Sequence, residues 1–214
     1  VGVLEQECLM HHKRFFTFQN KKRPFIILKW AETQDGFIAP LTKDTTRPIW
    51  ISNDYSKQLV HKFRAKEQAI LVGTNTVLAD NPKLNVRSWF GEDPVRVVLD
   101  NNLRIPKYAN VFNESVKTIV FYDEGKVVED KKNVVFEKVD FTKNLAHQIC
   151  EVLQKHNIQS LIVEGGTQTL QTFLDENLWD EARVFVGEAK FLEGIKSPVL
   201  EQSIKRQSNI KNDV

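Results

Sequence analysis

The chain has 214 residues, enough for one large domain or two small ones, and its 41% hydrophobic and 27% charged residues are ordinary for a soluble globular protein. A formal charge of +2 gives no support to nucleic-acid binding, which needs a clustered basic face. Two distant cysteines, Cys8 and Cys150, exclude a disulfide framework and a cysteine-rich zinc site. No apolar run is long enough to span a bilayer. These features favour a cytoplasmic enzyme or binding protein.

An amphipathic, basic stretch at residues 8–23 comes first and is interpreted as a linker or a leading helix. Seven short apolar runs then predict buried β-strands. They are FIILKWA (25–31), AILVG (69–73), VRVVL (95–99), TIVFY (118–122), NVVFEKV (133–139), SLIVEGG (160–166) and ARVFVG (182–187). Most are continuously apolar, which is typical of strands covered on both faces.

Three helices are predicted between these strands. The first begins at one of the N-cap candidates Ser52–Asp54. The second uses Thr142 as its N-cap and ends near Asn157, and the third follows Gly165–Gly166 and ends near Asn177. Strands that alternate with helices predict an α/β domain with a mainly parallel sheet. The closely spaced strands within residues 118–139, which a polar connection joins, are the exception.

The turn at Gly165–Gly166 joins a predicted strand to a predicted helix. Glycines at such a point let the backbone approach a ligand, and the following helix directs free N–H groups at an anion. The same turn also occurs for steric reasons alone, so the local pattern leaves a phosphate site and a structural corner open. Glu164 ends the strand, where ligands of open α/β sheets bind and where a carboxylate is costly to bury without a partner. The alternative for Glu164 is a surface residue at a turn.

Further polar groups mark the ends of two other predicted strands. Lys29 interrupts an apolar run and either reaches solvent at a sheet edge or meets an anion. The segment GTNTVLADNPKLNVR (73–87) suits a polyol with a phosphate near Arg87, although Asp80–Pro82 is also a good turn signal. Arg64 adds a second positive group or lies on a solvated helix face. The five histidines form no recognisable metal constellation, so no metal is predicted.

Five segments of the chain occur in an order that is typical of one family. They are PFIILKWAETQDGFIA, WISND, FRAKEQAILVGTNTVLADNPKLNVR, PVRVVLD and LIVEGGTQTLQTFL. From about residue 24 to about residue 200, the chain resembles the reductase domain of RibD, the bifunctional riboflavin-biosynthesis deaminase/reductase. The resemblance implies a dihydrofolate-reductase-like α/β fold, with a mixed, mainly parallel sheet flanked by helices, and usually a homodimer. It also implies that residues 1–23 are the end of a preceding deaminase domain with its linker, and that residues 24–214 form the reductase domain.

The resemblance further implies the reaction and its residues. NADPH would reduce the ribosyl group of 5-amino-6-(5-phosphoribosylamino)uracil to a ribityl chain, with hydride reaching C1′. The catalytic positions are matched by Lys29, Asp80 and Glu164; Lys29 and Asp80 are candidate proton donors, and Glu164 could instead fix the uracil or the ribose. The substrate-binding positions are matched by Arg64, Leu84, Arg87 and Glu164. The cofactor-binding positions are matched by Ala31, Trp50, Thr76, Asp80, Asn101, Gly166, Thr167, Gln168, Thr169, Leu170, Gln171 and Thr172.

Two alternatives stay open. The chain could be another reductase of the same fold, acting on a folate or on the deaminated or non-deaminated form of the pyrimidine. It could also be a nucleotide-binding regulatory domain without turnover. Arg64, Asp80 and Arg87 favour a phosphorylated, polyhydroxylated substrate over a pteridine, and the presence of Lys29, Asp80 and Glu164 together argues against an inactive site.

Overall fold

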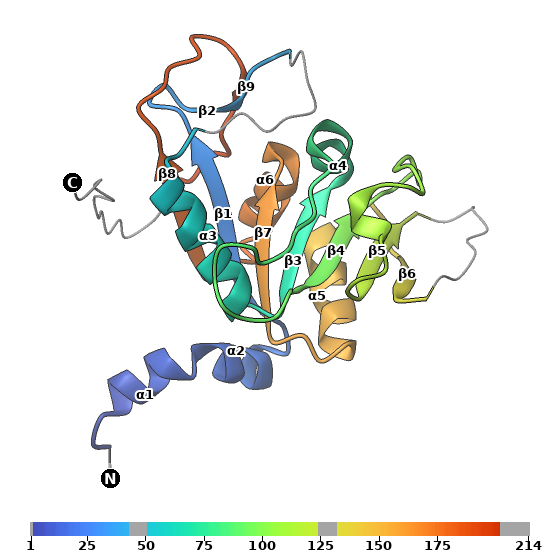
Figure 1. The fold of residues 1–214 in the computed structure, drawn as a ribbon. Coiled ribbons are helices and arrows are strands. Elements are labelled where there is room, and N and C mark those ends of the chain that lie inside the picture. Colours follow the sequence, from blue (N-terminus) through green and yellow to red (C-terminus); the bar gives the residue numbers. More distant parts are fainter. Residues whose placement is uncertain (1, 43–50, 124–131, 202–214) are drawn as a thin grey trace.

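A computed structural model describes residues 2–42, 51–123 and 132–201 of the chain (Figure 1). The main sheet consists of β1 (Phe25–Glu32), β3 (Ala69–Gly73), β4 (Val95–Leu99), β5 (Thr118–Tyr122), β6 (Val134–Lys138), β7 (Ser160–Gly165) and β8 (Glu181–Val186). Its strand order is β6-β5-β4-β3-β7-β1-β8, and the neighbouring strands in it pair in parallel. The predicted α/β fold with a mainly parallel sheet is therefore confirmed.

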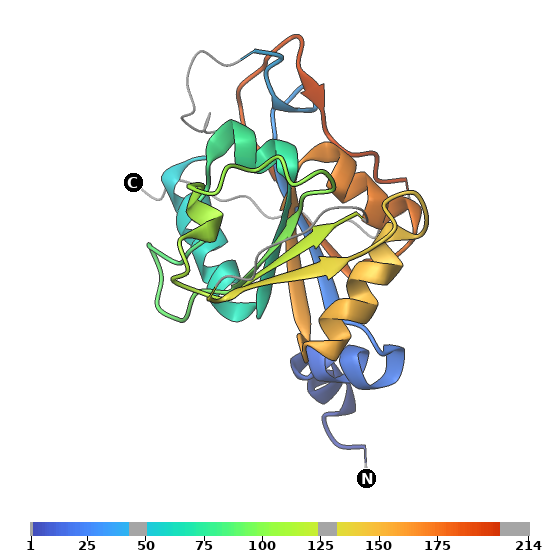
Figure 2. The ribbon, with the colours of Figure 1, turned by 90° about the vertical axis from the view of Figure 1, so that its right-hand side faces the viewer.

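Helices cover both faces of this sheet (Figure 2). Helix α3 (Asp54–Lys66) lies on one face, and α5 (Leu145–Lys155) and α6 (Thr167–Asp175) lie on the other. The other described helices are α4 (Thr74–Asp80), the short 3-10 helix η1 (Asn110–Phe112), and α1 (Glu5–His11) and α2 (Lys13–Lys21), which lie below the amino-terminal end of the sheet. In β1, Ile26 and Leu28 pack into the core beneath α5 and α6, whereas Phe25 and Ile27 pack into the core on the side of α3. Burial on both faces explains why the strands are continuously apolar.

The start of α3 follows the sequence expectation, whereas the start of α5 does not. Asn53 caps α3 by accepting a hydrogen bond from the Ser56 N–H at 2.9 Å. Thr142 is not the N-cap of α5, because its hydroxyl donates to Asp140 Oδ1 at 2.6 Å and the helix begins at Leu145. The α5 terminus is instead capped from a distance: the Glu176 carboxylate accepts from the backbone N–H groups of Ala146 and His147 at 3.0 and 3.1 Å. A carboxylate at a helix N-terminus also complements the helix dipole.

Two further features were not predicted. Strands β5 and β6, which a polar stretch of sequence connects, pair in parallel like the rest of the sheet. A separate antiparallel pair, β2 (Phe37–Ala39) and β9 (Ile195–Lys196), lies beyond the carboxyl ends of the main strands (Figure 1). Within the described ranges, no helix is long and apolar enough to cross a membrane.

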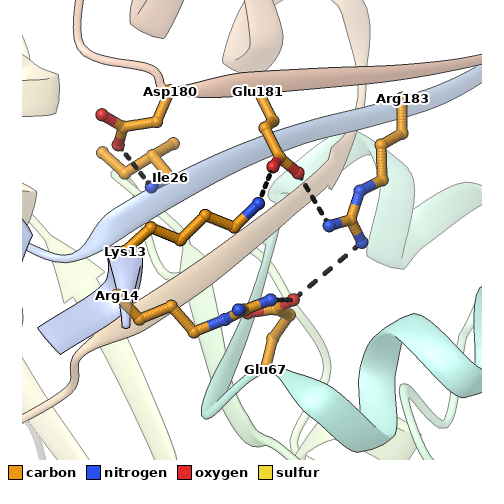
Figure 3. A network of polar contacts seen from close by, with 7 residues as sticks. All are labelled: Lys13, Arg14, Ile26, Glu67, Asp180, Glu181 and Arg183. Atoms are coloured by element: carbon orange, nitrogen blue, oxygen red, sulfur yellow. Dashed lines mark hydrogen bonds and ion pairs between the residues drawn. The ribbon is translucent and has the colours of Figure 1, made fainter. Parts of the chain in front are cut away.

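Residues 8–23 contain parts of two helices, and α2 is tied to the amino-terminal end of the sheet by ion pairs (Figure 3). Arg14 donates two hydrogen bonds to Glu67, whose side chain is fully buried: Nε lies 2.7 Å from Oε2, and Nη2 lies 2.5 Å from Oε1. Lys13 pairs with Glu181, which also accepts from Arg183 Nη2 at 2.8 Å. Arg183 Nη1 lies 3.9 Å from Glu67. The network joins α2 to the C-terminal end of α3 and to the start of β8.

Arg14→Met is therefore expected to lower the free energy of unfolding, measured by denaturant titration, by about 2 kcal/mol. This is less than the roughly 3–5 kcal/mol for breaking a fully buried pair, because Arg14 is partly exposed and Arg183 remains near Glu67. Lys21→Met is the matched control: Lys21 is more exposed, and its partner Asp180 keeps Arg23, so the loss should stay below about 0.5 kcal/mol. Equal losses in the two variants would contradict the role given to the Arg14–Glu67 pair.

Candidate active site

A cleft of about 1230 Å³ runs along the carboxyl ends of β1, β7, β3 and β4. The chain passes from β1 to β3 and then outward to β6, and it returns through β7, which inserts between β3 and β1. Such a reversal of strand order is where open α/β sheets bind ligands. Residues of β2 and β9, among them Ile38 and Ile195, also line the cleft.

Most of the predicted site residues meet in this cleft. Those that line it are Lys29, Ala31, Thr76, Asp80, Asn101, Glu164, Gly166, Thr167, Gln168, Thr169, Leu170, Gln171 and Thr172. Trp50 falls outside the described residues. Three predicted substrate contacts, Arg64, Leu84 and Arg87, are not among its lining residues.

A buried group of charges occupies the ends of β1 and β7. Arg64, from α3, donates two hydrogen bonds to the Glu164 carboxylate: Nε lies 3.0 Å from Oε1, and Nη2 lies 2.6 Å from Oε2. The two side chains are only 13% and 8% exposed. Strands β1 and β7 pair with Leu28 opposite Val163. The next residues along the two strands, Lys29 and Glu164, therefore lie side by side. The bidentate geometry is the strong form of a charge-assisted hydrogen bond.

The charges of this group set its protonation states. Burial acts to raise the pKa of Glu164, but the positive charges of Arg64 and Lys29 outweigh burial and lower that pKa to about 2. Burial lowers the pKa of Lys29; Glu164 opposes this and Arg64 adds to it. Glu164 is therefore a carboxylate at neutral pH, and Lys29 gives up its proton more readily than an exposed lysine does. A group of this kind is suited to donating a proton during a reaction.

In the segment after α4, Leu84 is buried and Arg87 is exposed. Leu84 is 2% exposed and lies in the core on the α3 side of the sheet, with a backbone φ of 53°. Its side chain is thus in the core, and a contact to substrate would have to come from its backbone. Arg87 is exposed, and its Nη1 donates to Asn85 Oδ1 at 2.8 Å. Arg64 Nη1 donates to the Asn85 carbonyl at 3.2 Å, so the same arginine contacts both Glu164 and this segment.

The glycine turn brings α6 against the end of β3. Gly165 has a φ of 139°, which side chains disfavour, and the Gly165–Gly166 peptide bond is cis. A Cβ on Gly73 would come within 2.7 Å of Thr169 Oγ1, so the helix packs closely on the strand. Gly166 is the N-cap of α6 and provides no side-chain cap. The first turn of α6 lines the cleft, and a helix N-terminus without a side-chain cap favours an anion there.

The β4 end of the cleft contains a polar atom that needs a partner. Asn101 Oδ1 is buried and accepts no hydrogen bond from the described residues. Buried polar groups are almost always paired, so this acceptor fits a ligand donor such as an amino group. From β1 to β4 there are three strand spacings, roughly 14 Å. This length, the α6 N-terminus at its middle and Asn101 at its far end fit a dinucleotide cofactor.

Arg104 is a candidate cofactor contact that sequence reasoning missed. It lines the cleft beyond β4, and its Nη2 donates to Asn75 Oδ1 at 3.1 Å. Asp100, which is 1% exposed, fixes the turn by accepting from the backbone N–H groups of Arg104 and Ile105, each at 2.9 Å. The only signal in the sequence is an aspartate and an arginine shortly after a strand, which is weak. Within the described part of the chain, no group of three or more His, Cys, Asp or Glu side chains could hold a metal ion.

Comparison with known proteins connects this site to a family. The family described as the RibD C-terminal domain matches residues 24–201. The chain is 36% identical to the riboflavin biosynthesis protein RibD of Aquifex aeolicus, covering 99% of this chain and 61% of the relative. It is 32% identical to the 2,5-diamino-6-ribosylamino-4(3H)-pyrimidinone 5′-phosphate reductase of Archaeoglobus fulgidus, covering 83% of this chain and 86% of that protein.

A solved structure agrees with these matches. The Thermotoga maritima diaminohydroxyphosphoribosylaminopyrimidine deaminase/5-amino-6-(5-phosphoribosylamino)uracil reductase superposes with a TM-score of 0.82 at 34% identity. The match covers 99% of this chain and 59% of that one, so the chain spans about three fifths of the length of its bifunctional relatives. The resemblance drawn from five sequence segments is confirmed: the chain belongs to the RibD C-terminal domain family.

Proposed function

We propose that this chain is an NADPH-dependent reductase that transfers hydride to C1′ of the ribosyl group of 5-amino-6-(5-phosphoribosylamino)uracil, giving the ribitylamino product. The observation that carries the proposal is the buried Lys29–Glu164–Arg64 group, whose Lys29 and Glu164 line one cleft with the N-terminus of α6. The names of the relatives support it, in particular the phosphorylated ribosylaminopyrimidine on which the Archaeoglobus fulgidus reductase acts.

The residues of the cleft have distinct roles in this reaction. The reduced nicotinamide supplies a hydride when it is bound. Reduction of the opened sugar at C1′, as an imine, also requires one proton on the adjacent nitrogen. Lys29, whose pKa burial lowers, is the first candidate donor of this proton, and Asp80 at the end of α4 is the second. Glu164 stays ionised and can accept hydrogen bonds from the ribose or the pyrimidine with the lone pairs that Arg64 leaves.

A turnover assay separates this proposal from its alternatives. The purified chain is mixed with NADPH and, in turn, the deaminated pyrimidine, the non-deaminated pyrimidine and dihydrofolate, and the absorbance of the reduced nicotinamide is followed. Oxidation with the deaminated compound supports the proposal, and faster oxidation with the non-deaminated compound would reassign the substrate. Tight NADPH binding without oxidation in any mixture would favour the regulatory domain.

We propose that Arg104 selects NADPH over NADH by contacting the phosphate that distinguishes them. Its fork of N–H donors is suited to a phosphate, and it lies at the end of the cleft away from Lys29. Arg104→Ala should raise KM for NADPH about tenfold and leave KM for NADH within about twofold, as expected for one lost charge-assisted contact. Lys107→Ala removes a charge from the same segment outside the cleft lining and should change neither value. Equal rises for both cofactors would remove Arg104 from this role.

We also propose that the chain acts as a homodimer, as the resemblance implies. Strand β8 is an outer strand of the described sheet, and its Val184 and Val186 are 37% and 63% exposed. Exposed apolar residues on an outer strand are suited to pairing with a second copy. Light scattering that gives the mass of a single chain at micromolar concentration would contradict this.

A further inference from the structure

His61 is a buried histidine next to the proposed substrate site, and the reaction outlined above does not use it. It lies on α3, three residues before Arg64, so the two side chains share a face of the helix. Its exposure is 5%, which is unusual for a polar residue on a surface helix. A buried histidine of this kind needs a specific hydrogen-bond partner.

The partner is the backbone of Arg87. The segment between α4 and β4 contains no regular secondary structure at residues 81–94. Side chains form hydrogen bonds with the backbone of three successive residues in it. Arg64 Nη1 donates to the Asn85 carbonyl at 3.2 Å, the Val86 N–H donates to Asp93 Oδ1 at 2.7 Å, and the Arg87 N–H donates to His61 Nδ1 at 3.2 Å. His61 therefore fixes the backbone of Arg87, whose guanidinium is exposed.

This hydrogen bond requires a neutral imidazole, because Nδ1 accepts only when it carries no proton. Burial lowers the pKa of His61, as do the charges of Arg64 on the same helix and of Arg87; the Asn85 carbonyl and Glu164 on β7 oppose them. At neutral pH the ring is therefore an acceptor. A proton on Nδ1 would break the bond to the Arg87 N–H and would add a positive charge beside two arginines.

We propose that His61 is a positioning residue: in its neutral form it holds Arg87 where the guanidinium binds the phosphate group of the substrate, and protonation releases Arg87. The inference rests on the proposed function for the identity of the phosphorylated substrate. It adds a residue that acts through Arg87 without touching the ligand. It also predicts that affinity for the phosphorylated substrate weakens in acid while cofactor binding does not.

The test measures the binding of ribose 5-phosphate by isothermal titration, with unphosphorylated ribose for comparison. His61→Asn places an amide oxygen near the position of Nδ1 and does not titrate, whereas His61→Leu keeps apolar bulk and removes the acceptor. At pH 7.5, His61→Asn should bind ribose 5-phosphate within about twofold of wild type, and His61→Leu should weaken it about fivefold, in the range of one misplaced hydrogen-bonding group. Affinity for ribose and KM for NADPH should stay unchanged in both variants.

The Arg87→Ala variant shows how much affinity for ribose 5-phosphate is lost when the guanidinium is absent. Adding His61→Leu to it should weaken binding no further, because His61 acts only through Arg87. Between pH 7.5 and pH 5.5, the wild type should lose more affinity for ribose 5-phosphate than His61→Asn does. The loss that remains in His61→Asn reports the second ionisation of the phosphate itself, near pH 6.

Wild-type affinity in His61→Leu, an identical acid profile in His61→Asn, or no binding of ribose 5-phosphate by the wild type would each overturn the proposal. Should His61→Leu fail to fold, as judged by circular dichroism, the acid profile of His61→Asn decides the question. Failure of the wild-type chain to oxidise NADPH would reject the proposed reaction, and the ribose 5-phosphate series would still decide the role of His61.

Discussion

Replacing Lys29 by methionine is expected to lower kcat about 10²-fold or more, because the proton donor is lost, and to leave KM for NADPH within about threefold. Methionine keeps an unbranched side chain of similar length and removes Nζ. Steady-state kinetics across pH gives a second readout. A lysine that donates a proton acts in its protonated form, so wild-type kcat should fall as pH rises through the lowered pKa of Lys29. That alkaline decline should disappear in Lys29→Met.

Two further variants complete this prediction. Asp80→Asn tests the second candidate donor in the same assay, and Lys66→Met, which removes an exposed lysine from the end of α3, is the control for loss of charge alone. Near-wild-type turnover in both Lys29→Met and Asp80→Asn would reject the assignment of a proton donor to this pair.

Glu164→Gln is expected to abolish most activity and to lower the free energy of unfolding by about 3–5 kcal/mol, because it leaves Arg64 and Lys29 buried without their counter-charge. The loss is measured by denaturant titration at neutral pH. The free energy of unfolding of the wild type should also fall at acidic pH, and the Glu164→Gln variant should lack this fall. The pKa of Glu164 in the fold, about 2, is below the ordinary value near 4.3, so its contribution to stability is full above that ordinary value and is lost as pH falls toward 2.

A double variant separates stability from function. Arg64→Met combined with Glu164→Leu removes both charges of the pair, and apolar replacement of a buried ion pair often restores stability. This variant should regain most of the stability lost in Glu164→Gln and should remain inactive. Equal stability of Glu164→Gln and the wild type would contradict the burial and pairing described for this group.

The central fold could be predicted because local and global requirements agree. In β1 the run from Phe25 to Leu28 is continuously apolar, since Phe25 and Ile27 face one core and Ile26 and Leu28 the other. The strands β2 and β9 were missed because they are two or three residues long and gain their stability from each other across the chain. The cap of α5 was missed for the same reason: Glu176 is 30 residues from the N–H group of Ala146 that it accepts from.

The site was predictable as a set of polar residues and not as an arrangement. The ends of parallel strands meet at one edge, so Lys29, Asp80 and Glu164 could be expected in one cleft. The pairing of Arg64 with Glu164 joins residues 100 positions apart and depends on how α3 lies on the sheet. The burial of Leu84 and the position of Arg104 depend on backbone conformation in two irregular segments, which residue pattern does not determine.

Isotope transfer tests the central claim most directly. The chain is incubated with NADPH deuterated at both C4 positions and with 5-amino-6-(5-phosphoribosylamino)uracil, and the product is analysed by mass spectrometry and NMR. The proposed reaction predicts a ribitylamino product that carries one deuterium, at C1′ of the side chain. A ribitylamino product without deuterium, deuterium at another carbon, or the absence of reduced product would contradict it.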